Sequence, residues 1–225
     1  MSSIKSMLGV EPKQVSENIY SPSKLALKLT VDKKTDYDHS VFEDKNTDRN
    51  RKILVIGTEQ TLLEMQNGKN FLKGNHPVEM FVPMLHFMKA GFEKDIATPT
   101  GKPLKLEERA FPEEDREVMA IYETFKSQIL APLSLQEIVT KLDKNSPYTA
   151  VYIPGGHKML PLTGYIPGAM PWYFGERLQV LGVTIVNKMP NGKVCHDRKL
   201  ITGDSPKAAN KLGKLAATLM LSETV

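Results

Sequence analysis

Several features that would define a protein's class at once are scarce in this sequence. Cys195 is the one cysteine among 225 residues, which excludes an internal disulfide framework and a zinc site of several cysteines. The longest apolar stretch, residues 80–88, is interrupted by Pro83 and His86 and is too short to span a bilayer. Residues 1–10 lack the apolar core of a secretory signal. We therefore expect a protein of a reducing compartment, located in the cytoplasm, with no membrane partner.

Nucleotide-binding and nucleic-acid-binding patterns are also missing. There is no G-x-x-x-x-G-K-[ST] loop and no dinucleotide fingerprint, so no ATP dependence is indicated. The net charge is only +4, from 30 Lys and Arg against 26 Asp and Glu, which is too small to indicate nucleic acid. Positive charge gathers between Lys188 and Lys214, but no aromatic residues interleave it for base stacking. We interpret that stretch as a solvated face.

What the sequence does contain is an ordinary globular composition, with 40% apolar and 25% charged residues. Residues 1–50 are polar and weakly patterned, with a dense run of charges from Asp32 to Lys52. We interpret them as an N-terminal extension that covers a domain, although a floppy tail explains the first part of it equally well. The domain itself is expected over residues 51–225.

Strand and helix signals alternate from Lys52 onward. Strands are expected over residues 52–57, 92–98, 149–156 and 183–187, and helices over residues 77–90, 113–129, 134–142 and 172–181. Pro83 predicts a kink or a break in its helix, and Pro190-Asn191-Gly192 predicts a hairpin turn. The alternation predicts an α/β fold in which helices cover both faces of a mostly parallel sheet.

The last helix has the clearest signals. Ser205 can cap it, and Pro206 can take its first position. Its predicted apolar stripe consists of Ala209, Leu212, Ala216 and Leu219.

Glu79 is the first candidate site residue. It lies in the first turn of a helix that follows a strand and a loop, near the carboxyl ends of the strands, where open α/β sheets place their sites. A carboxyl group there could act as an acid, a base or the hydrogen-bond partner of a nucleophile. The alternative, which the residues alone favour, is that Glu79 complements the helix dipole.

The second candidate is the run Pro154-Gly155-Gly156-His157, directly after a predicted strand. Paired glycines allow backbone N–H groups to approach an anion or an oxyanion closely. A plain tight turn explains the same residues equally well.

Other reactive side chains are weaker candidates. Cys195 and His196 are sequence neighbours whose side chains should diverge, and no base is indicated near the thiol, so we interpret Cys195 as a bystander. His86 and Glu93 are the only close pair of metal-type ligands, whereas a zinc site needs at least three ligands from the protein.

Longer stretches of the sequence are more specific than these local patterns. They are NGKNFLKGNHPVEMFVPMLHFMKAGFE at residues 67–93, YIPGGH at 152–157, GYIPG and WYFGE within 164–176, and DRKLITGDSPKAANKLGKLA at 197–216. Over roughly residues 51–221 the chain resembles, collinearly, the HchA branch of the DJ-1/PfpI superfamily. Members of that branch are known as heat-shock protein 31, protein deglycase and glyoxalase III.

The resemblance implies a flavodoxin-like α/β sandwich, a homodimer and a stress-response holding chaperone for unfolded proteins. It also implies a cofactor-independent hydrolase, which removes methylglyoxal and glyoxal adducts from proteins and nucleotides or converts methylglyoxal to lactate. Glu79 matches the family's glutamate beneath the catalytic sulfur. Gly156 matches the glycine whose backbone N–H helps form the oxyanion site.

The chain departs from the family between His157 and Gly164. In the family this junction holds a helix, a strand that carries the Cys-His elbow, and a further strand. Here only residues 158–163 separate the two flanking motifs. An internal unit is therefore missing, and with it the nucleophile, its histidine and the aspartate, so we expect a shortened sheet.

The family's metal site is also mostly gone. Glu93 matches its glutamate, but Met88 and Phe125 occupy the positions of its two histidines. Methionine is a poor match for an imidazole at zinc, and phenylalanine cannot bind a metal. We expect no metal and no other cofactor.

Three interpretations follow, and they leave open whether the chain is an enzyme. It is a holding chaperone without covalent chemistry, because a glutamate and an oxyanion site cannot replace a thiolate. Alternatively, it is an active deglycase whose written sequence lacks an internal segment, or a poorly folding deletion product. Expected partners are unfolded or glycated proteins, glycated nucleotides, and further copies of the chain.

Overall fold

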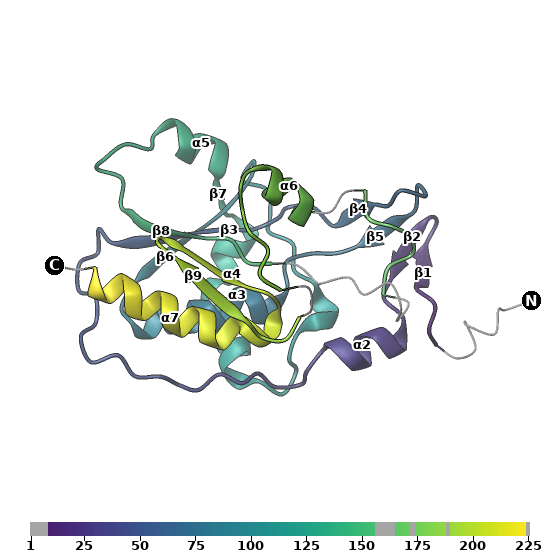
Figure 1. Ribbon diagram of the computed structural model, residues 1–225, viewed down its shortest axis with the longest axis horizontal. Coiled ribbons are helices and arrows are strands. Elements are labelled where there is room, and N and C mark those ends of the chain that lie inside the picture. Colours follow the sequence, from purple (N-terminus) through teal and green to yellow (C-terminus); the bar gives the residue numbers. More distant parts are fainter. Residues whose placement is uncertain (1–8, 156–164, 172–173, 188–189, 224–225) are drawn as a thin grey trace, which may run out of the picture.

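The structure, a computed structural model, describes residues 9–155, 165–171, 174–187 and 190–223 (Figure 1). Its strands are β1 (Lys13–Ser16), β2 (Ile19–Ser21), β3 (Lys52–Ile56), β4 (Leu62–Glu64), β5 (Asn70–Leu72), β6 (Glu93–Thr98), β7 (Leu133–Ser134), β8 (Tyr148–Tyr152), β9 (Val194–Asp197) and β10 (Leu200–Gly203). Its helices are α2 (Lys24–Thr30), α3 (Pro77–Lys89), α4 (Arg116–Leu130), α5 (Leu135–Thr140), α6 (Phe174–Val180) and α7 (Ala209–Ser222), with 3₁₀ turns η1 (Glu108–Ala110) and η3 (Pro206–Ala208). None of the described helices is long and apolar enough to cross a bilayer.

The main sheet has the strand order β7-β6-β3-β8, and all of its neighbouring strands are parallel. β3 lies inside the sheet, which is why its β-branched run is buried on both faces as predicted. Leu54 of β3 lies beside Asp95 of β6 and Val151 of β8. The strands expected within residues 52–57, 92–98 and 149–156 are confirmed, as is the α/β fold class with a mostly parallel sheet.

A second sheet joins the N-terminal extension to the domain. Its order is β1-β2-β5-β4, and β2 of the extension pairs in parallel with β5. Further along the extension, the Thr35 N–H and hydroxyl both donate to the Asp115 carboxylate, and the Asn210 amide donates to the Asp36 carbonyl. From residue 9 the extension is therefore packed on the domain, rather than forming a free tail.

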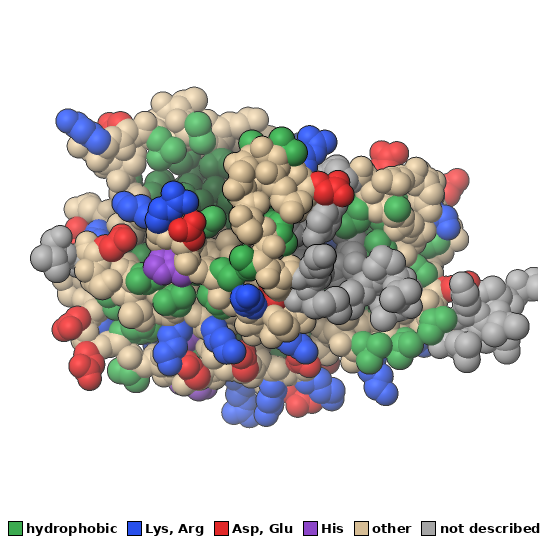
Figure 2. Space-filling model, viewed as in Figure 1, with side chains coloured by type: hydrophobic (Ala, Val, Ile, Leu, Met, Phe, Trp, Pro, Cys, Tyr) green, Lys and Arg blue, Asp and Glu red, His purple; other side chains and the backbone are tan. Residues whose placement is uncertain are grey.

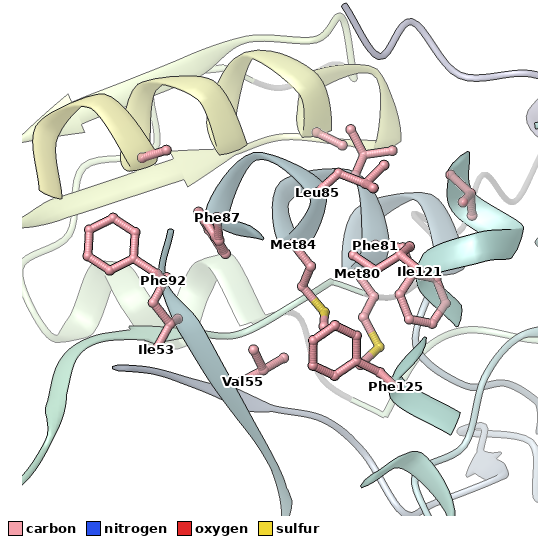
Figure 3. Close-up of a cluster of buried hydrophobic side chains, with 14 of the residues drawn as sticks. Ile53, Val55, Met80, Phe81, Met84, Leu85, Phe87, Phe92, Ile121 and Phe125 are labelled. Carbon is pink, nitrogen blue, oxygen red and sulfur yellow. The ribbon is translucent and has the colours of Figure 1, made fainter. Parts of the chain in front are cut away.

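The core lies between the main sheet and three helices. α3 packs against both α4 and α7, and its buried face carries Met80, Met84 and Phe87 (Figure 3). Ile53 and Val55 of β3 meet this face from the sheet side (Figure 3). Burying such a contiguous apolar cluster is the main source of folding free energy.

Two sequence predictions in the C-terminal part are wrong. Residues 183–187 form no strand, although their composition favours one, because a strand needs a neighbour for its backbone hydrogen bonds and none of the described strands pairs with them. The hairpin turn lies at Arg198 and Lys199, between β9 and β10, rather than at residues 190–192. The β9–β10 ribbon forms its own two-stranded sheet and does not extend the main one.

The predicted stripe of α7 is displaced. Ala209 is buried as expected, but Leu212, Ala216 and Leu219 are only partly buried, and the contact line runs through Ala209, Asn210, Gly213 and Ala217. Small residues are needed there because α7 crosses α3 closely. A Cβ atom added at Gly213 would lie 2.5 Å from the Pro83 Cα and 2.9 Å from the His86 Cδ2.

This close crossing predicts the effect of Gly213→Ala. Alanine should favour the helix, but its Cβ has no room against backbone atoms of α3, so we expect a loss of about 1–3 kcal/mol in unfolding free energy. Chemical denaturation measures this directly. Lys211→Ala, on the exposed side of the same helix, should change stability by less than about 0.5 kcal/mol. Equal stability of Gly213→Ala and the wild type would contradict the packing of α7 on α3.

Candidate functional site

The structure places Glu79 near the carboxyl ends of β3 and β8, in the first turn of α3. His76 is the N-cap of this helix, and its Nδ1 accepts a hydrogen bond from the Val78 N–H at 3.2 Å. The His76 N–H donates to the Gly155 carbonyl oxygen, also at 3.2 Å, so the beginning of α3 is tied to the loop that follows β8. The helix start and the glycine-containing loop, which were singled out separately, therefore meet at one place.

Gly155 lies directly against the carboxyl group of Glu79. A Cβ atom added at Gly155 would lie 3.1 Å from Glu79 Oε2 and 3.2 Å from Glu79 Cδ. A glycine here thus lets the backbone approach the acid closely. Gly156 and His157 lie outside the described residues, so the oxyanion role of the Gly156 N–H stays a prediction.

The Glu79 carboxyl is in an environment that disfavours its charge. Its Oε2 is buried and has no hydrogen-bond partner among the described residues. Burial raises the pKa of Glu79 to about 8, and the nearby negative charge of Asp204 acts in the same direction. The carboxyl is therefore mostly protonated at pH 7 and can donate a hydrogen bond or a proton. A neutral carboxyl gains little from the helix dipole, so dipole complementation does not explain this residue.

A side chain of β8 supplies a hydrogen bond that the backbone of α3 lacks at the Glu79 carbonyl. Pro83 has no N–H, so the Glu79 carbonyl four residues earlier loses its partner within the helix. The Tyr152 hydroxyl donates to that carbonyl oxygen. Burial raises the pKa of Tyr152 well above its usual value, and the Glu79 charge acts in the same direction, so the hydroxyl keeps its proton. Of the kink or break predicted at Pro83, the break is wrong, since α3 runs unbroken from Pro77 to Lys89.

A double-mutant cycle tests this contact. Tyr152→Phe leaves a buried carbonyl unsatisfied and should cost about 1–3 kcal/mol in unfolding free energy. In a Pro83→Ala background the backbone N–H restored at position 83 can bond to the Glu79 carbonyl, so the same change should cost at least about 1 kcal/mol less. Denaturant unfolding of the four proteins gives this coupling free energy. Additive effects would show that the Tyr152 hydroxyl and Pro83 act independently.

Asp204 is a second acid of the site, and sequence reasoning missed it. Its carboxylate accepts hydrogen bonds from the Asn187 amide at 2.7 Å, the Asn191 and Gly192 N–H groups at 3.0 Å, and the Ser205 hydroxyl at 2.6 Å. Burial opposes its ionisation, but these bonds outweigh burial and lower the pKa of Asp204. Ser205 was predicted to cap the last helix with its side chain, but its hydroxyl bonds to Asp204 instead.

Further buried polar groups lie near Glu79. Tyr165 is fully buried and packs on Phe71, with 5.8 Å between ring centroids. Glu107 is also buried, and the Arg109 Nε donates to its carboxylate at 2.6 Å. The pKa of Glu107 is raised by burial and partly lowered again by Arg109. Glu107 and Arg109 are only two residues apart in the sequence, but no local pattern indicated that the carboxylate would be buried.

Cys195 and His196 lie on β9, outside this arrangement. Cys195 is a half-buried free thiol opposite Thr202 of β10, and His196 Nε2 lies 2.6 Å from the Arg198 carbonyl oxygen. Neighbouring residues of a strand point to opposite sides, so the imidazole is not directed at the thiol. The geometry agrees with the interpretation of Cys195 as a bystander.

The residues at the family's metal position do not fit a metal. Glu93 and Met88 are exposed, and Phe125 is buried beneath the Lys94 ammonium group, which lies 5.3 Å from its ring centroid. The Lys94 Nζ also donates to the Phe92 carbonyl at 2.7 Å. Within the described ranges, no three His, Cys, Asp or Glu side chains gather closely enough to hold an ion. A cation would meet one carboxylate and a competing ammonium group.

We therefore expect no zinc to bind in this position. Elemental analysis of the purified protein should find far less than one zinc per chain, and added zinc should leave the melting temperature unchanged. Glu93→Gln is the matched control. It removes the carboxylate, which is the one metal ligand left at this position, and it should not alter the fold. One zinc per chain in the wild type that is lost in Glu93→Gln would contradict this expectation.

A separate hollow of about 780 Å³ lies over the N-terminal extension and the beginning of α4. Charges of both signs line it, and several are already engaged, as in the 2.9 Å ion pair between Lys33 and Glu114 beside it. None of its lining residues belongs to the surroundings of Glu79. The hollow is therefore separate from the Glu79 site.

Comparison with known proteins gives a consistent result. The protein/nucleic acid deglycase HchA of Pseudomonas aeruginosa strain UCBPP-PA14 is 37% identical over 277 aligned positions, covering 93% of this chain and 94% of the relative. Protein/nucleic acid deglycase 1 of Escherichia coli K12 is 34% identical over 265 positions, covering 92% and 93%. No protein-family model matches the chain.

Two solved structures share the fold, with TM-scores of 0.58 and 0.57 over 77% and 76% of this chain and 99% of each of theirs. The second is Rapid Encystment Protein 24 kDa of Francisella tularensis, and the sequence identities are only 16% and 14%.

The alignment also bears on chain length. Because the comparison with the Pseudomonas relative runs over 277 positions and this chain has 225 residues, at least 52 positions lie opposite gaps in this chain. Even so, the match extends over more than nine-tenths of both proteins. The chain belongs to the HchA branch of the DJ-1/PfpI superfamily, the family of the protein/nucleic acid deglycases.

Proposed function

We propose that the protein is a stress-response holding chaperone of the HchA type, built on a deglycase scaffold whose covalent chemistry is absent. The observation that carries this proposal is the position of β8. In the described part of the chain β8 pairs with β3 alone, and the side chains of Val151 and Ile153 are 57% and 70% exposed. Exposed apolar surface beside a strand with one unpaired edge suits the capture of non-native protein.

More apolar surface lies on the elements around this strand. Figure 2 shows hydrophobic side chains in the recess between α5 and α6. Large hydrophobic residues exposed on and near these two elements are Leu133, Val139, Leu142, Val180, Leu181 and Val186. Monomeric proteins rarely leave such groups uncovered together, so self-association, as a homodimer or a larger assembly, belongs to the proposal. We also place the protein in the cytoplasm, since one free thiol fits a reducing compartment.

The surroundings of Glu79 and of Cys195 support the proposed absence of covalent chemistry. Glu79 is a protonated acid at neutral pH, and an acid can assist a nucleophile without replacing one. Cys195, the single cysteine, pairs with a residue of β10 and lacks an imidazole directed at it. The scaffold therefore retains the acid of the family's site and not its thiolate.

An aggregation assay tests the proposal. A heat-unfolded test protein is incubated with the full chain and without ATP, and light scattering follows its aggregation. We expect suppression near an equimolar ratio, together with strong binding of a hydrophobic dye. An inert globular protein at equal mass is the control. A monodisperse monomer that binds no dye and leaves the test protein's aggregation unchanged would contradict the proposal.

A second function has its own support. At least 52 positions of the alignment lie opposite gaps in this chain, yet the alignment is 37% identical and covers 93% of the chain, so the rest of the relative's sequence is largely retained. If the internal segment is present in the natural protein, the chain is an active deglycase of glycated proteins or nucleotides, as its relatives are named. An intact mass measured beside the coding DNA sequence decides between the two. A mass at least about 6 kDa above 25.2 kDa would favour the enzyme, at roughly 0.11 kDa for each added residue.

A further inference from the structure

The two edges of the main sheet differ in how they are protected. β7, at one edge, has two residues, and a short edge strand offers little backbone for pairing. β8, at the other edge, has five residues and pairs only with β3 among the described strands. Its outer backbone N–H and C=O groups therefore have no ladder partner within the described residues.

β8 also lacks the usual devices that prevent strand addition. Residues 148–153 read Tyr-Thr-Ala-Val-Tyr-Ile, with no lysine, no other charge and no proline. The register shift between β8 and β3 lies at Lys52 and Ile53, near the beginning of the pair rather than along the outer edge. An uncharged edge strand of this kind is a template for another strand.

The side chains of β8 separate into two faces. Ala150 and Tyr152 pack towards the core, where the Tyr152 ring lies 5.5 Å from that of Phe87. Thr149, Val151 and Ile153 are exposed on the opposite face. An added strand would therefore gain a row of backbone hydrogen bonds and cover apolar side chains on one face.

We propose that the outer edge of β8 binds an extended, uncharged apolar polypeptide segment as an added strand. This inference rests on the proposed chaperone function and names its binding site and the conformation of the bound client. The occupant must be extended because backbone groups are what the edge offers, and it must be apolar because Val151 and Ile153 carry no charge to attract another kind of partner.

The shape of the surface favours a single strand over a second folded copy. The recess between α5 and α6 is hollowed in Figure 2, and one extended segment can enter a hollow. A second copy would have to bring its own β8, flanked by the same elements, into that hollow. Relatives have at least 52 further aligned positions, so this scaffold normally accommodates additional chain.

The probe is a fluorescein-labelled peptide of alternating threonine and valine with capped ends. Its control has the same side chains with every backbone amide N-methylated, so that neither edge can donate hydrogen bonds. Fluorescence anisotropy with the full chain should show at least tenfold weaker binding of the methylated peptide. Equal binding of both peptides would overturn the proposal, because it would show adhesion to apolar side chains alone.

Two matched substitutions locate the site. Val151→Lys places a charge beside the β8 edge and should weaken binding of the unmodified peptide at least tenfold. Val41→Lys makes the same change at an exposed valine of the N-terminal extension and should leave binding within twofold. Ile153→Lys gives a second edge variant if Val151→Lys unfolds. Wild-type affinity in both folded edge variants would overturn the proposal.

The aggregation assay separates this inference from the proposed function. If wild-type chain suppresses aggregation and Val151→Lys suppresses it equally well, the chaperone function stands and the β8 site is wrong. If wild-type chain fails to suppress aggregation, the chaperone function is wrong, while peptide binding still tests the edge. A wild-type dimer that ignores the peptide and dissociates on Val151→Lys would assign the edge to a second copy and overturn the proposal.

Discussion

Methylglyoxal added to the purified protein is expected to disappear no faster than in a buffer control. Removing a catalytic nucleophile lowers turnover by on the order of 10⁶-fold, and residual binding groups recover little of it. Glu79 is present and protonated, but no cysteine is held beside it among the described residues. Cys195→Ser should therefore leave this background rate unchanged.

Two outcomes would contradict this expectation in different ways. Turnover that Cys195→Ser abolishes would identify Cys195 as a nucleophile and would show that its placement on β9 is not the reactive one. Turnover that survives Cys195→Ser and disappears in Glu79→Gln would show that the acid supports chemistry without a thiolate. Methylglyoxal consumption by the wild type at the rate of the buffer control would support the account, provided that a deglycase relative, as the positive control, is active in the same assay.

The second large effect concerns stability and pH. The carboxyl of Glu79 ionises near its ordinary pKa of 4.5 in the unfolded chain and at about 8 in the folded protein. Between these values the folded state holds one proton more than the unfolded state, so rising pH lowers the unfolding free energy. The slope contributed by this group is at most about 1.4 kcal/mol per pH unit.

Glu79→Gln removes this slope, because an amide does not titrate. The unfolding free energy of the variant minus that of the wild type should therefore rise by up to about 4 kcal/mol between pH 5 and pH 8. Denaturant unfolding at several pH values measures the difference. Glu43→Gln, at an exposed glutamate, is the matched control for the substitution. A Glu79→Gln difference that stays constant with pH would show that the carboxyl is not held neutral.

Local sequence patterns predicted the elements whose signals lie within a few neighbouring residues, such as β3 and α3. The β-branched run beginning at Lys52 formed β3, and proline at the first position with glycine after the end bounded α3. Glu79 could be singled out because a helix start after a strand is a recognisable place in an α/β sheet. Its actual environment could not, since burial and the charge of Asp204 come from residues far along the chain.

The failures have a common physical cause. Residues 183–187 have the composition of a strand, but a strand exists only where a neighbour accepts its hydrogen bonds. Pro83 signals a kink or a break, but α3 is not broken, and the Tyr152 hydroxyl satisfies the carbonyl that Pro83 leaves without a partner. The N-terminal sheet was not predicted at all, because β1, β2, β4 and β5 have only three or four residues each and acquire stability from one another.

The exposed edge of β8 is the feature on which the chaperone proposal and the strand-binding inference both depend. Residue-resolved hydrogen exchange of the native protein tests it most directly. In a parallel strand, alternate amides point to opposite sides, so every second amide of β8 should exchange rapidly while those of β3 are protected on both sides. Protection along the whole of β8 equal to that of β3 would show that another strand covers this edge and would contradict the account.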